Sequence, residues 1–310
     1  MNHKEKKIAV GGQAVMEGVM MRGPNRVAVA VRKPDGTIVL KTESFQSITK
    51  RFRLLAWPIL RGAVVLVESL VLGMKSLSFS SDVALANDAP STFNKRTGFW
   101  QNLTLAMTLI FAFALGITLF FYVPILLTDL MGFRTGFSFN LIDGILRLAI
   151  FLLYVYLISR WNEIKRVFQY HGAEHKSIYA YEDQKDLNIE SAKPYTTLHP
   201  RCGTSFLLIV MVVSIVIFMF LGRPDNLGER LLRLAMVPLI GGISYELIKL
   251  SDKGARHPFF RLLIAPGLWL QKMTTREPDD SQIEVALVAL KAALGLEPQI
   301  GHSVINHMDS

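Results

Sequence analysis

Two histidines and a glutamate lie close together in the segment YHGAEHKSIYAYE, residues 170–182. His171 and His175 stand at positions i and i+4, so on a helix both imidazoles project from one face and can chelate one metal ion. Glu174 lies between them and has the chemistry of a general base toward water. The alternative interpretation is that all three side chains are solvated on a helix surface and do no chemistry.

A second short motif, HPRCGTS at residues 199–205, places His199 and Cys202 directly before an apolar segment. The N-terminal turn of a helix favours a thiolate over a thiol, and the thiolate is the form that binds zinc or attacks a substrate. The alternative is a His-Pro turn followed by a small, inert cysteine. Cys202 is the sole cysteine of the chain, which excludes a disulfide framework and any site that requires several thiolates.

The composition is typical of an integral membrane protein, because 51% of the 310 residues are hydrophobic and only 19% are charged. Four apolar segments are long enough to cross a bilayer: Trp100–Leu127, Leu141–Ser159, Ser205–Leu221 and Leu231–Leu250. In the second segment, Asp143 and Arg147 stand at i and i+4, and we expect them to pair. The sequence therefore predicts an α-helical polytopic membrane protein with four transmembrane helices in a lipid bilayer.

The basic residues predict how these helices are oriented. With four crossings, 29 of the 34 Lys and Arg residues fall on one side of the membrane, which the positive-inside rule makes cytoplasmic. The segment Leu54–Met74 is also apolar, but a fifth crossing would place the basic N-terminal residues outside. We therefore expect an interfacial or re-entrant helix there and two cytoplasmic termini. The formal net charge of +9 is then a topological signal, and we expect no nucleic-acid partner.

This topology brings the candidate chemical residues to one membrane surface. Residues 160–204 form a cytoplasmic loop between the second and third crossings, and the fourth crossing returns to that surface near Glu246. An ionisable residue inside a membrane segment is a functional candidate by default. Five residues are therefore expected in one cytoplasmic-facing layer: His171, His175, His199, Cys202 and Glu246. The alternative for Glu246 is a local pair with Lys249.

The predicted elements divide the chain into four regions. They are a cytoplasmic segment (1–53), an interfacial helix with a polar linker at 76–98 (54–98), the four-span region (99–250) and a C-terminal cytoplasmic or interfacial segment (251–310). The alternating run Arg26–Thr42 predicts a β-hairpin about a Pro-Asp-Gly turn. We expect Pro258–Leu270, broken at Pro266, to lie at the interface, and Ser281–Leu296 to form a short amphipathic helix with a serine cap.

The N-terminal segment GGQAVMEGVMMRG, residues 11–23, interrupts an apolar run with glycines and polar residues. Glycine permits a close approach of the backbone to a ligand or to another helix. On a helix Gln13 and Glu17 would share one face, and Gln13, Glu17 and Arg22 are candidates for lining a site. The alternative is that they serve packing and local structure alone.

Three segments in this order, GGQAVMEGVMMRGP, YHGAEHKSIYAYE and HPRCGTSF, make the sequence similar to the YqhQ-like bacterial membrane proteins over nearly the whole chain. That family has no established reaction and is commonly labelled a predicted metal-dependent enzyme. The resemblance implies a multi-pass protein of the bacterial inner membrane with a suspected metal site. The positions that it indicates are His171, Glu174, His175, His199 and Cys202.

The order His-x-x-Glu-His also resembles the inverted zinc peptidases, in which both histidines bind zinc and the glutamate activates water. In those enzymes a later helix supplies a third, carboxylate ligand, and Glu246 could take that part. They are soluble mixed α/β domains, however, and the sequence predicts no such domain in this chain.

Two hypotheses of function follow from these observations. In the first, the protein is a membrane-embedded metal-dependent hydrolase acting on a peptide or a membrane substrate. Zinc or another divalent ion would be held by His171, His175 and one further ligand, with Glu174 as general base. In the second, it is a non-enzymatic scaffold in which His199 and Cys202 complete a closed four-ligand zinc site. A transporter is disfavoured because the four spans show no repeat symmetry.

Overall fold

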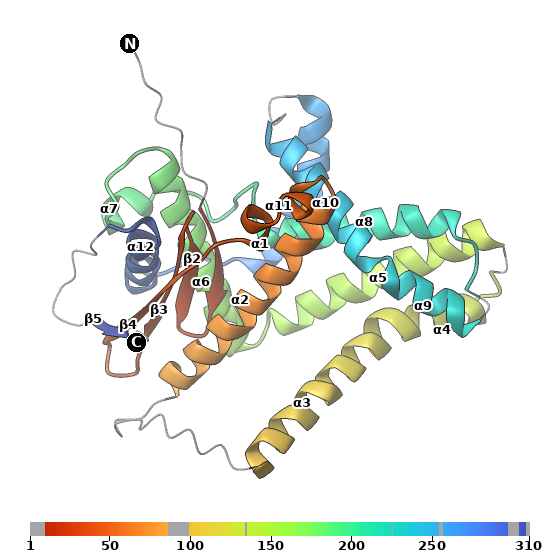
Figure 1. The fold of residues 1–310 in the computed structure, drawn as a ribbon, viewed down its shortest axis with the longest axis horizontal. Helices are drawn as coiled ribbons and strands as arrows, with labels where there is room; N and C mark the ends of the chain where they lie inside the picture. Colours follow the sequence, from red (N-terminus) through yellow and green to blue (C-terminus); the bar gives the residue numbers. More distant parts are fainter. Residues whose placement is uncertain are drawn as a thin grey trace. The chain divides into compact units, whose positions relative to one another are not determined.

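The computed structural model describes residues 10–85, 99–133, 135–224, 226–253, 257–296 and 304–307 (Figure 1). The chain divides into two units, and each is considered by itself. The first unit is drawn from residues 1–87, 158–208 and 241–310, and the second from residues 88–157 and 209–240. All residues for which the sequence suggests a chemical role belong to the first unit.

The first unit contains a sheet with the strand order β1-β2-β3-β4-β5. Its strands are β1 (Gly11–Val15), β2 (Gly18–Arg22), β3 (Arg26–Arg32), β4 (Ile38–Ser44) and β5 (Val304–His307). Strands β1 to β4 form an antiparallel meander, and β5 lies parallel to β4. The predicted hairpin at Arg26–Thr42 is confirmed as β3 and β4, joined by a turn in which Gly36 has a φ of +87°.

Residues 11–23 form a second β-hairpin, which corrects the expectation of a helix in this segment. Glycines are frequent in this segment and disfavour a helix, because they lose the most backbone entropy there. The two residues between the strands, Met16 and Glu17, allow Val15 and Gly18 to pair. Gly18 also permits the close approach of β3, since a Cβ atom at this position would lie 2.2 Å from a backbone oxygen of that strand.

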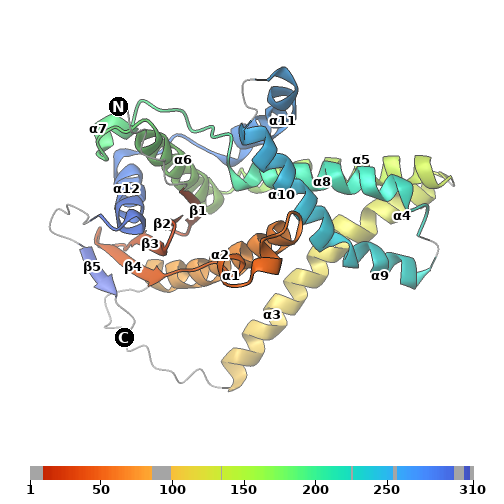
Figure 2. The ribbon, with the colours of Figure 1, turned by 45° about the horizontal axis from the view of Figure 1, so that its top comes forward.

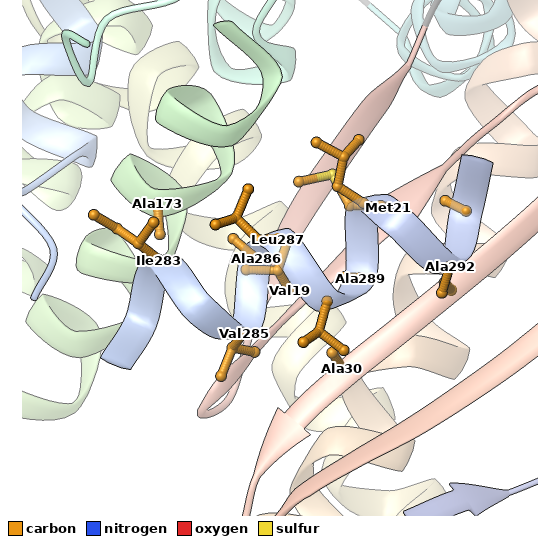
Figure 3. Packing of buried hydrophobic residues seen from close by; sticks show 14 of the residues in the cluster. Val19, Met21, Ala30, Ala173, Ile283, Val285, Ala286, Leu287, Ala289 and Ala292 are labelled. Atoms are coloured by element: carbon orange, nitrogen blue, oxygen red, sulfur yellow. The ribbon is translucent and has the colours of Figure 1, made fainter. Parts of the chain in front are cut away.

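Helices cover both faces of this sheet (Figure 2). Helices α6 (Asn162–Glu182) and α12 (Asp280–Leu294) lie on one face, and α2 (Leu60–Ala84) lies on the other. Side chains of β2, β3, α6 and α12 interdigitate in the larger core (Figure 3). Leu72, Phe79 and Val83 of α2 pack against the opposite face of the sheet. This three-layer arrangement is a mixed α/β domain, and its presence corrects the expectation that the chain contains none.

Helix α12 is a central element of the core and not the surface helix that was predicted at Ser281–Leu296. It begins after Asp279, whose carboxylate accepts from the backbone N–H of Gln282 in a capping box, so the predicted serine cap is wrong. The helix ends at Gly295, which has a φ of +76°. Most of its residues are buried because the sheet covers one side and α6 covers another. The run of alanines on α12 makes this close double contact feasible.

Two further boundaries differ from the sequence-based expectations. Helix α2 begins at Leu60, after the short helices α1 (Ile48–Arg51) and η1 (Arg53–Ala56), and it continues to Ala84. Part of the predicted polar linker is therefore helical, and two of its serines, Ser76 and Ser80, are buried in this helix. The remainder, residues 86–98, lies outside the described residues. Helix α11 (Pro258–Thr274) continues through Pro266, where a break was predicted.

The remaining helices carry most of the apolar sequence. They are α3 (Phe99–Ile117), the π-helical turn η2 (Thr118–Tyr122), α4 (Val123–Leu130), α5 (Gly136–Ile158), the short α7 (Ile189–Ala192), α8 (Gly203–Phe220), α9 (Leu227–Ala235) and α10 (Val237–Lys253). Within the described residues, five stretches are long and apolar enough to cross a membrane: Leu60–Ala84, Ile110–Leu130, Gly136–Ile158, Gly203–Phe220 and Leu227–Ser251. Four coincide with the predicted spans, and α2 is the fifth. The predicted pairing within α5 is confirmed, since Arg147 Nη2 lies 2.8 Å from Asp143 Oδ2.

We expect Leu290→Ala to lower the free energy of unfolding by about 2–5 kcal/mol, because the substitution leaves a cavity in the core between α12 and the sheet. Leu290 is fully buried. Leu296, which is 51% exposed just after the helix, provides a matched control whose alanine variant should stay within about 0.5 kcal/mol of the parent. Urea denaturation of the purified proteins in detergent measures both. Equal stability of the two variants would contradict the placement of α12.

Candidate metal centre

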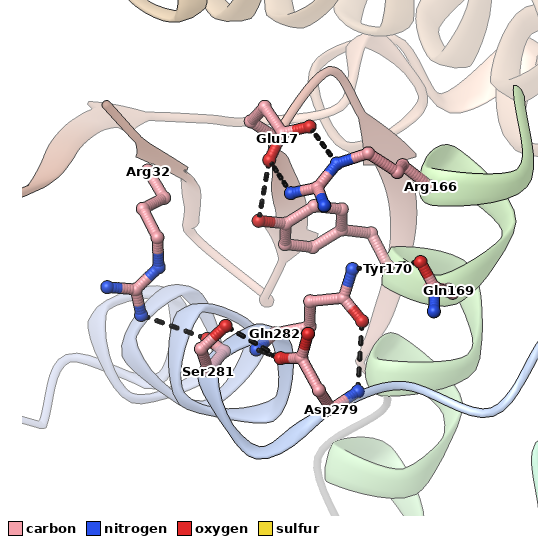
Figure 4. Close-up of polar contacts among 8 residues, drawn as sticks. All are labelled: Glu17, Arg32, Arg166, Gln169, Tyr170, Asp279, Ser281 and Gln282. Carbon is pink, nitrogen blue, oxygen red and sulfur yellow. Dashed lines mark hydrogen bonds and ion pairs between the residues drawn. The ribbon is translucent and has the colours of Figure 1, made fainter. Parts of the chain in front are cut away.

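Helix α6 is held on the sheet by polar contacts at its N-terminal half (Figure 4). The guanidinium of Arg166 donates to both carboxylate oxygens of Glu17, and the Tyr170 hydroxyl lies 3.3 Å from the same carboxylate. Glu17 has a φ of +49°, a left-handed conformation that is uncommon outside glycine. The candidate site residue Glu17 therefore connects the β1–β2 hairpin to α6. It orients the helix that carries the histidines.

Three potential metal ligands converge at the buried side of α6. The ligand atoms of His171, His175 and Cys202 all lie within 4.8 Å of one another, and no other group of this kind occurs among the residues the structure describes. His171 Nε2 lies 3.0 Å from Cys202 Sγ. Both histidines project from the same face of α6, as their spacing predicts, while Cys202 directly precedes α8. None of the three side chains is more than 9% exposed.

Backbone carbonyls set the tautomers of both histidines. His171 Nδ1 lies 2.8 Å from the carbonyl oxygen of Thr274, and His175 Nδ1 lies 2.5 Å from that of Thr197. A carbonyl oxygen only accepts, so each Nδ1 carries the proton and each Nε2 presents a lone pair. Nε2 of His175 is buried without a hydrogen-bond partner. Histidines that bind metals use this arrangement, in which the outer ring N–H donates to a fixed acceptor.

His199 is close to this group but is oriented differently. Its ring centroid lies 5.6 Å from that of His175, and its Nδ1 accepts a hydrogen bond from the backbone N–H of Arg201. Nε2 of His199 lies 3.5 Å from a carboxylate oxygen of Glu182. Nε2 of His199 is, like that of His175, buried without a hydrogen-bond partner, but His199 is not part of the group whose ligand atoms lie within 4.8 Å of one another. The structure therefore places His199 beside the site and not among its donors.

The surroundings of Cys202 and His175 favour the protonation states that a metal requires. Burial opposes ionisation of the Cys202 thiol, but the facing His175 and the hydroxyl and N–H of Thr204 outweigh it, so the pKa of Cys202 lies below its ordinary value. Thr204 Oγ1 is 3.1 Å from the sulfur. Burial lowers the pKa of His175, against the raising effect of the facing Cys202 sulfur. Metal ligands must be deprotonated, and both shifts act in that direction.

Glu174 connects the three ligands to the edge of the sheet. The side chain is 5% exposed, and its carboxylate lies against the backbone of Gly12 in β1. A Cβ atom at Gly12 would lie 2.9 Å from the carboxyl carbon of Glu174, so only glycine permits this approach. Burial raises the pKa of Glu174 to about 8, against the opposing effects of His171 and the Gly12 amide. A carboxyl group with such a pKa can both accept and donate a proton near neutral pH.

Three other candidate residues lie away from the ligands. The structure pairs Glu246 of α10 with Arg61 of α2, with Arg61 Nε 2.6 Å from Glu246 Oε1, so Glu246 does not join the histidines. Gln13 packs on α2, because a Cβ atom at Gly73 would lie 2.5 Å from Gln13 Oε1. Arg22 lies 3.4 Å from the buried Glu68, also on α2. All three contacts join α2 to its neighbours, and none lines the candidate metal centre.

Sequence reasoning missed several groups that support the site. The carbonyls of Thr197 and Thr274 orient the two histidines, and a backbone acceptor leaves no signal in residue type. Buried Gln271 of α11 accepts from the backbone N–H of His199 and donates to the His199 carbonyl, each at 2.8 Å. It thereby holds the segment before Cys202. The glycine pair at the start of β1 was the one available signal, because it indicated a close backbone approach.

The fold and the donor set describe a protein with apolar helices and a buried cluster of two histidines and a cysteine on an α/β layer. A family model described as "Protein of unknown function (DUF1385)" matches residues 57–296. The chain is 37% identical over 304 residues, 93% of each protein, to the "Uncharacterized protein YqhQ" of Bacillus subtilis (strain 168). The protein belongs to this family, which confirms the resemblance seen in its motifs. No solved structure shows a significant match to it.

We expect the thiol of metal-stripped protein to react with iodoacetamide with an inflection in rate at a pH below that of an ordinary cysteine, because the pKa of Cys202 is lowered. His175→Ala should move the inflection to higher pH, and Thr204→Val should do so by a smaller amount. Thr204→Ser, which keeps the hydroxyl, is the control. Mass spectrometry reports a single site, because the chain has one cysteine. A parent inflection at or above the ordinary thiol value would contradict this description.

Proposed function

We propose that this protein is a membrane-embedded, metal-dependent hydrolase in which His171, His175 and Cys202 bind Zn²⁺ and Glu174 acts as the general base. One observation carries the proposal. Two buried imidazoles are held by backbone carbonyls so that their Nε2 lone pairs meet a thiol of lowered pKa. Neutral imidazole nitrogens and a thiolate are ligands that zinc prefers.

The number of donors favours catalysis over a structural role. Structural zinc sites use four protein ligands, whereas catalytic sites use three and leave a position for water or substrate. His199, the fourth ligand of the scaffold hypothesis, has its Nδ1 occupied by the Arg201 amide. Glu246, the other candidate, is paired with Arg61. The three remaining ligands are therefore those of an open site. Another divalent metal, such as Co²⁺, could bind to the same ligands in place of Zn²⁺.

Each residue of the site then has a defined task. Zn²⁺, when bound, would supply the positive charge that activates water and polarises a carbonyl group. Glu174 accepts a proton from the attacking water and returns it to the leaving group. The Gly12 backbone and the surrounding apolar residues hold the carboxylate in place. Thr274 and Thr197 keep the imidazoles in the binding tautomer.

The membrane placement is part of the same proposal. We infer four transmembrane helices in the bacterial cytoplasmic membrane, with both termini on the cytoplasmic side. The distribution of 29 of 34 basic residues supports this orientation. Helix α2 is then interfacial, because Leu72, Phe79 and Val83 face the sheet while a row of apolar side chains is exposed on its other side. Cys202, which precedes α8, lies at the cytoplasmic surface.

We expect Glu174→Gln to reduce hydrolysis by about 10²–10⁴ while zinc content stays near one ion per chain, because an amide cannot accept the proton. His175→Ala should lose both zinc and activity. Glu163→Gln changes an exposed glutamate on the same helix and serves as the matched control. Bound zinc is measured by elemental analysis. Hydrolysis is measured with a peptide library and with p-nitrophenyl acetate as substrates. An active, zinc-loaded Glu174→Gln protein, together with zinc loss in His199→Ala, would favour the scaffold instead.

Reporter fusions test the topology. We expect a fusion after Ser44 and one after Leu85 to report the cytoplasm, because α2 does not cross the membrane in this proposal. A fusion after Gly132 should report the outside. Alkaline phosphatase and a green fluorescent reporter, which are active on opposite sides, give the measurement. A fusion after Leu85 that lies outside while the one after Ser44 lies inside would show that α2 crosses.

A further inference from the structure

The free edge of β1 lies next to the candidate metal centre. The Arg32 N–H donates to the Glu17 carbonyl at 2.8 Å. The backbone N–H and C=O groups of Glu17, and of every second residue after it in β2, therefore point toward β3. Backbone groups of successive residues point to alternate sides of a strand. The intervening residues of β2 therefore pair with Gly11, Gln13 and Val15 of β1. The N–H and C=O groups of Gly12 and Ala14 point outward, and within the described residues no strand pairs with this edge.

The described part of this edge carries no proline and no bulge, and Glu174 of α6 lies beside it at Gly12. Natural proteins shield sheet edges with charged side chains, prolines or bulges. Here the strand begins with Gly11 and Gly12, both exposed, and a Cβ atom at Gly11 would meet nothing within 4 Å. The Glu174 carboxylate lies against the backbone of Gly12, since a Cβ atom there would be 2.9 Å from its Oε1. An acceptor of the size of a peptide carbonyl can therefore reach the Gly12 backbone, directly beside the proposed general base.

We infer that the substrate is an extended polypeptide segment that pairs with the outer edge of β1 and so brings one of its peptide bonds to the metal centre. The inference rests on the proposed function and names its substrate class. An edge strand presents an N–H and a C=O group at every second residue, and an extended backbone is the chemical group that matches this repeat. Lipids and small esters have no such repeat. Side-chain sequence would matter little for this part of recognition.

Pairing would also change the environment of Glu174. A substrate carbonyl that accepts from the Gly12 N–H replaces the Glu174 carboxylate there and leaves it available to water. In the reaction, the water oxygen bonds to the carbonyl carbon of the peptide and the C–N bond breaks. Glu174 takes the proton from water and delivers it to the departing amine, so the products are a carboxylic acid and an amine. Water is the only co-reactant.

The test measures binding separately from hydrolysis. Zinc-loaded Glu174→Gln protein in detergent micelles captures peptides from a degenerate ten-residue library, and the best-captured sequence is resynthesised with one N-methyl group at each position in turn. We expect methylation to weaken binding by about fivefold or more at every second residue and by less than about twofold between them, because alternate amides face β1. Loss of binding without this period of two overturns the inference, as does the capture of no peptide.

Two variants test the protein side of the contact. Ala14→Pro removes an outward N–H that pairs with nothing in β2, so the fold and the zinc content should persist while peptide binding falls by about fivefold or more. Ala14→Ser keeps the N–H and should bind like the parent. Unchanged binding by a folded, zinc-loaded Ala14→Pro protein overturns the inference.

Hydrolysis of p-nitrophenyl acetate separates the two proposals. Zinc-dependent ester hydrolysis by the parent, without any peptide capture, supports the hydrolase and overturns the substrate assignment. Peptide capture with a period of two, but without hydrolysis of any substrate by the parent, supports the edge as a binding site and overturns the proposed function.

Discussion

The close packing of α6 against the backbone that follows α11 is the constraint on which the candidate metal centre depends. A Cβ atom at Gly172 would lie 2.2 Å from the carbonyl oxygen of Arg276 and 3.1 Å from a methyl group of Thr197. Any larger residue would push these segments away from the helix. The contact places the Thr274 carbonyl on His171 and the Thr197 carbonyl on His175. The orientation of both imidazoles therefore follows from one glycine and the two chains that close over it.

Charged side chains secure the same packing from both ends of α6. Arg166 and Glu17 hold its first half to the β1–β2 hairpin. Lys176 is buried in the second half, where it donates to the Lys193 carbonyl at 2.7 Å and pairs with Glu277 at 2.6 Å. A buried lysine is costly unless it is fully paired. Here the contacts of Lys176 connect the two segments whose carbonyls accept from the histidines. The free-energy cost of burying the lysine is therefore offset by the order that it gives to the site.

The sequence predicted those features that depend on short spacing. The i, i+4 histidines share a face of α6, the Pro-Asp-Gly turn closes a hairpin, and four apolar runs form helices. It did not predict the partner of Glu246, because Arg61 is distant in the chain and the pair depends on how α2 meets α10. It also missed strands β1 and β2 of the α/β layer, since β2 is buried on both faces and lacks the alternation that marks a surface strand.

The candidate site shows the same division. The residue types in the sequence indicated the candidate ligands. The orientation of the histidines depends instead on the backbone carbonyls of Thr197 and Thr274, which any residue could supply. His199 has the right chemistry and the right neighbourhood, yet it does not belong to the group whose ligand atoms lie within 4.8 Å of one another. The glycines of β1 indicated a close approach without identifying Glu174 as the group that approaches. Spacing and composition thus define the donors, and tertiary contacts decide which of them can act.

The acceptor for His171 has a consequence for the order in which the protein is made. Both histidines and Cys202 have been added to the chain once its first two thirds are complete, but Thr274 is added much later. Until then Nδ1 of His171 lacks the carbonyl that accepts its proton, and α12 is also missing from the core on which α6 rests. A nascent chain that pauses after α8 therefore carries all three ligands without their final geometry. In the proposed metal centre, selectivity for an ion therefore belongs to the finished protein and not to the nascent chain.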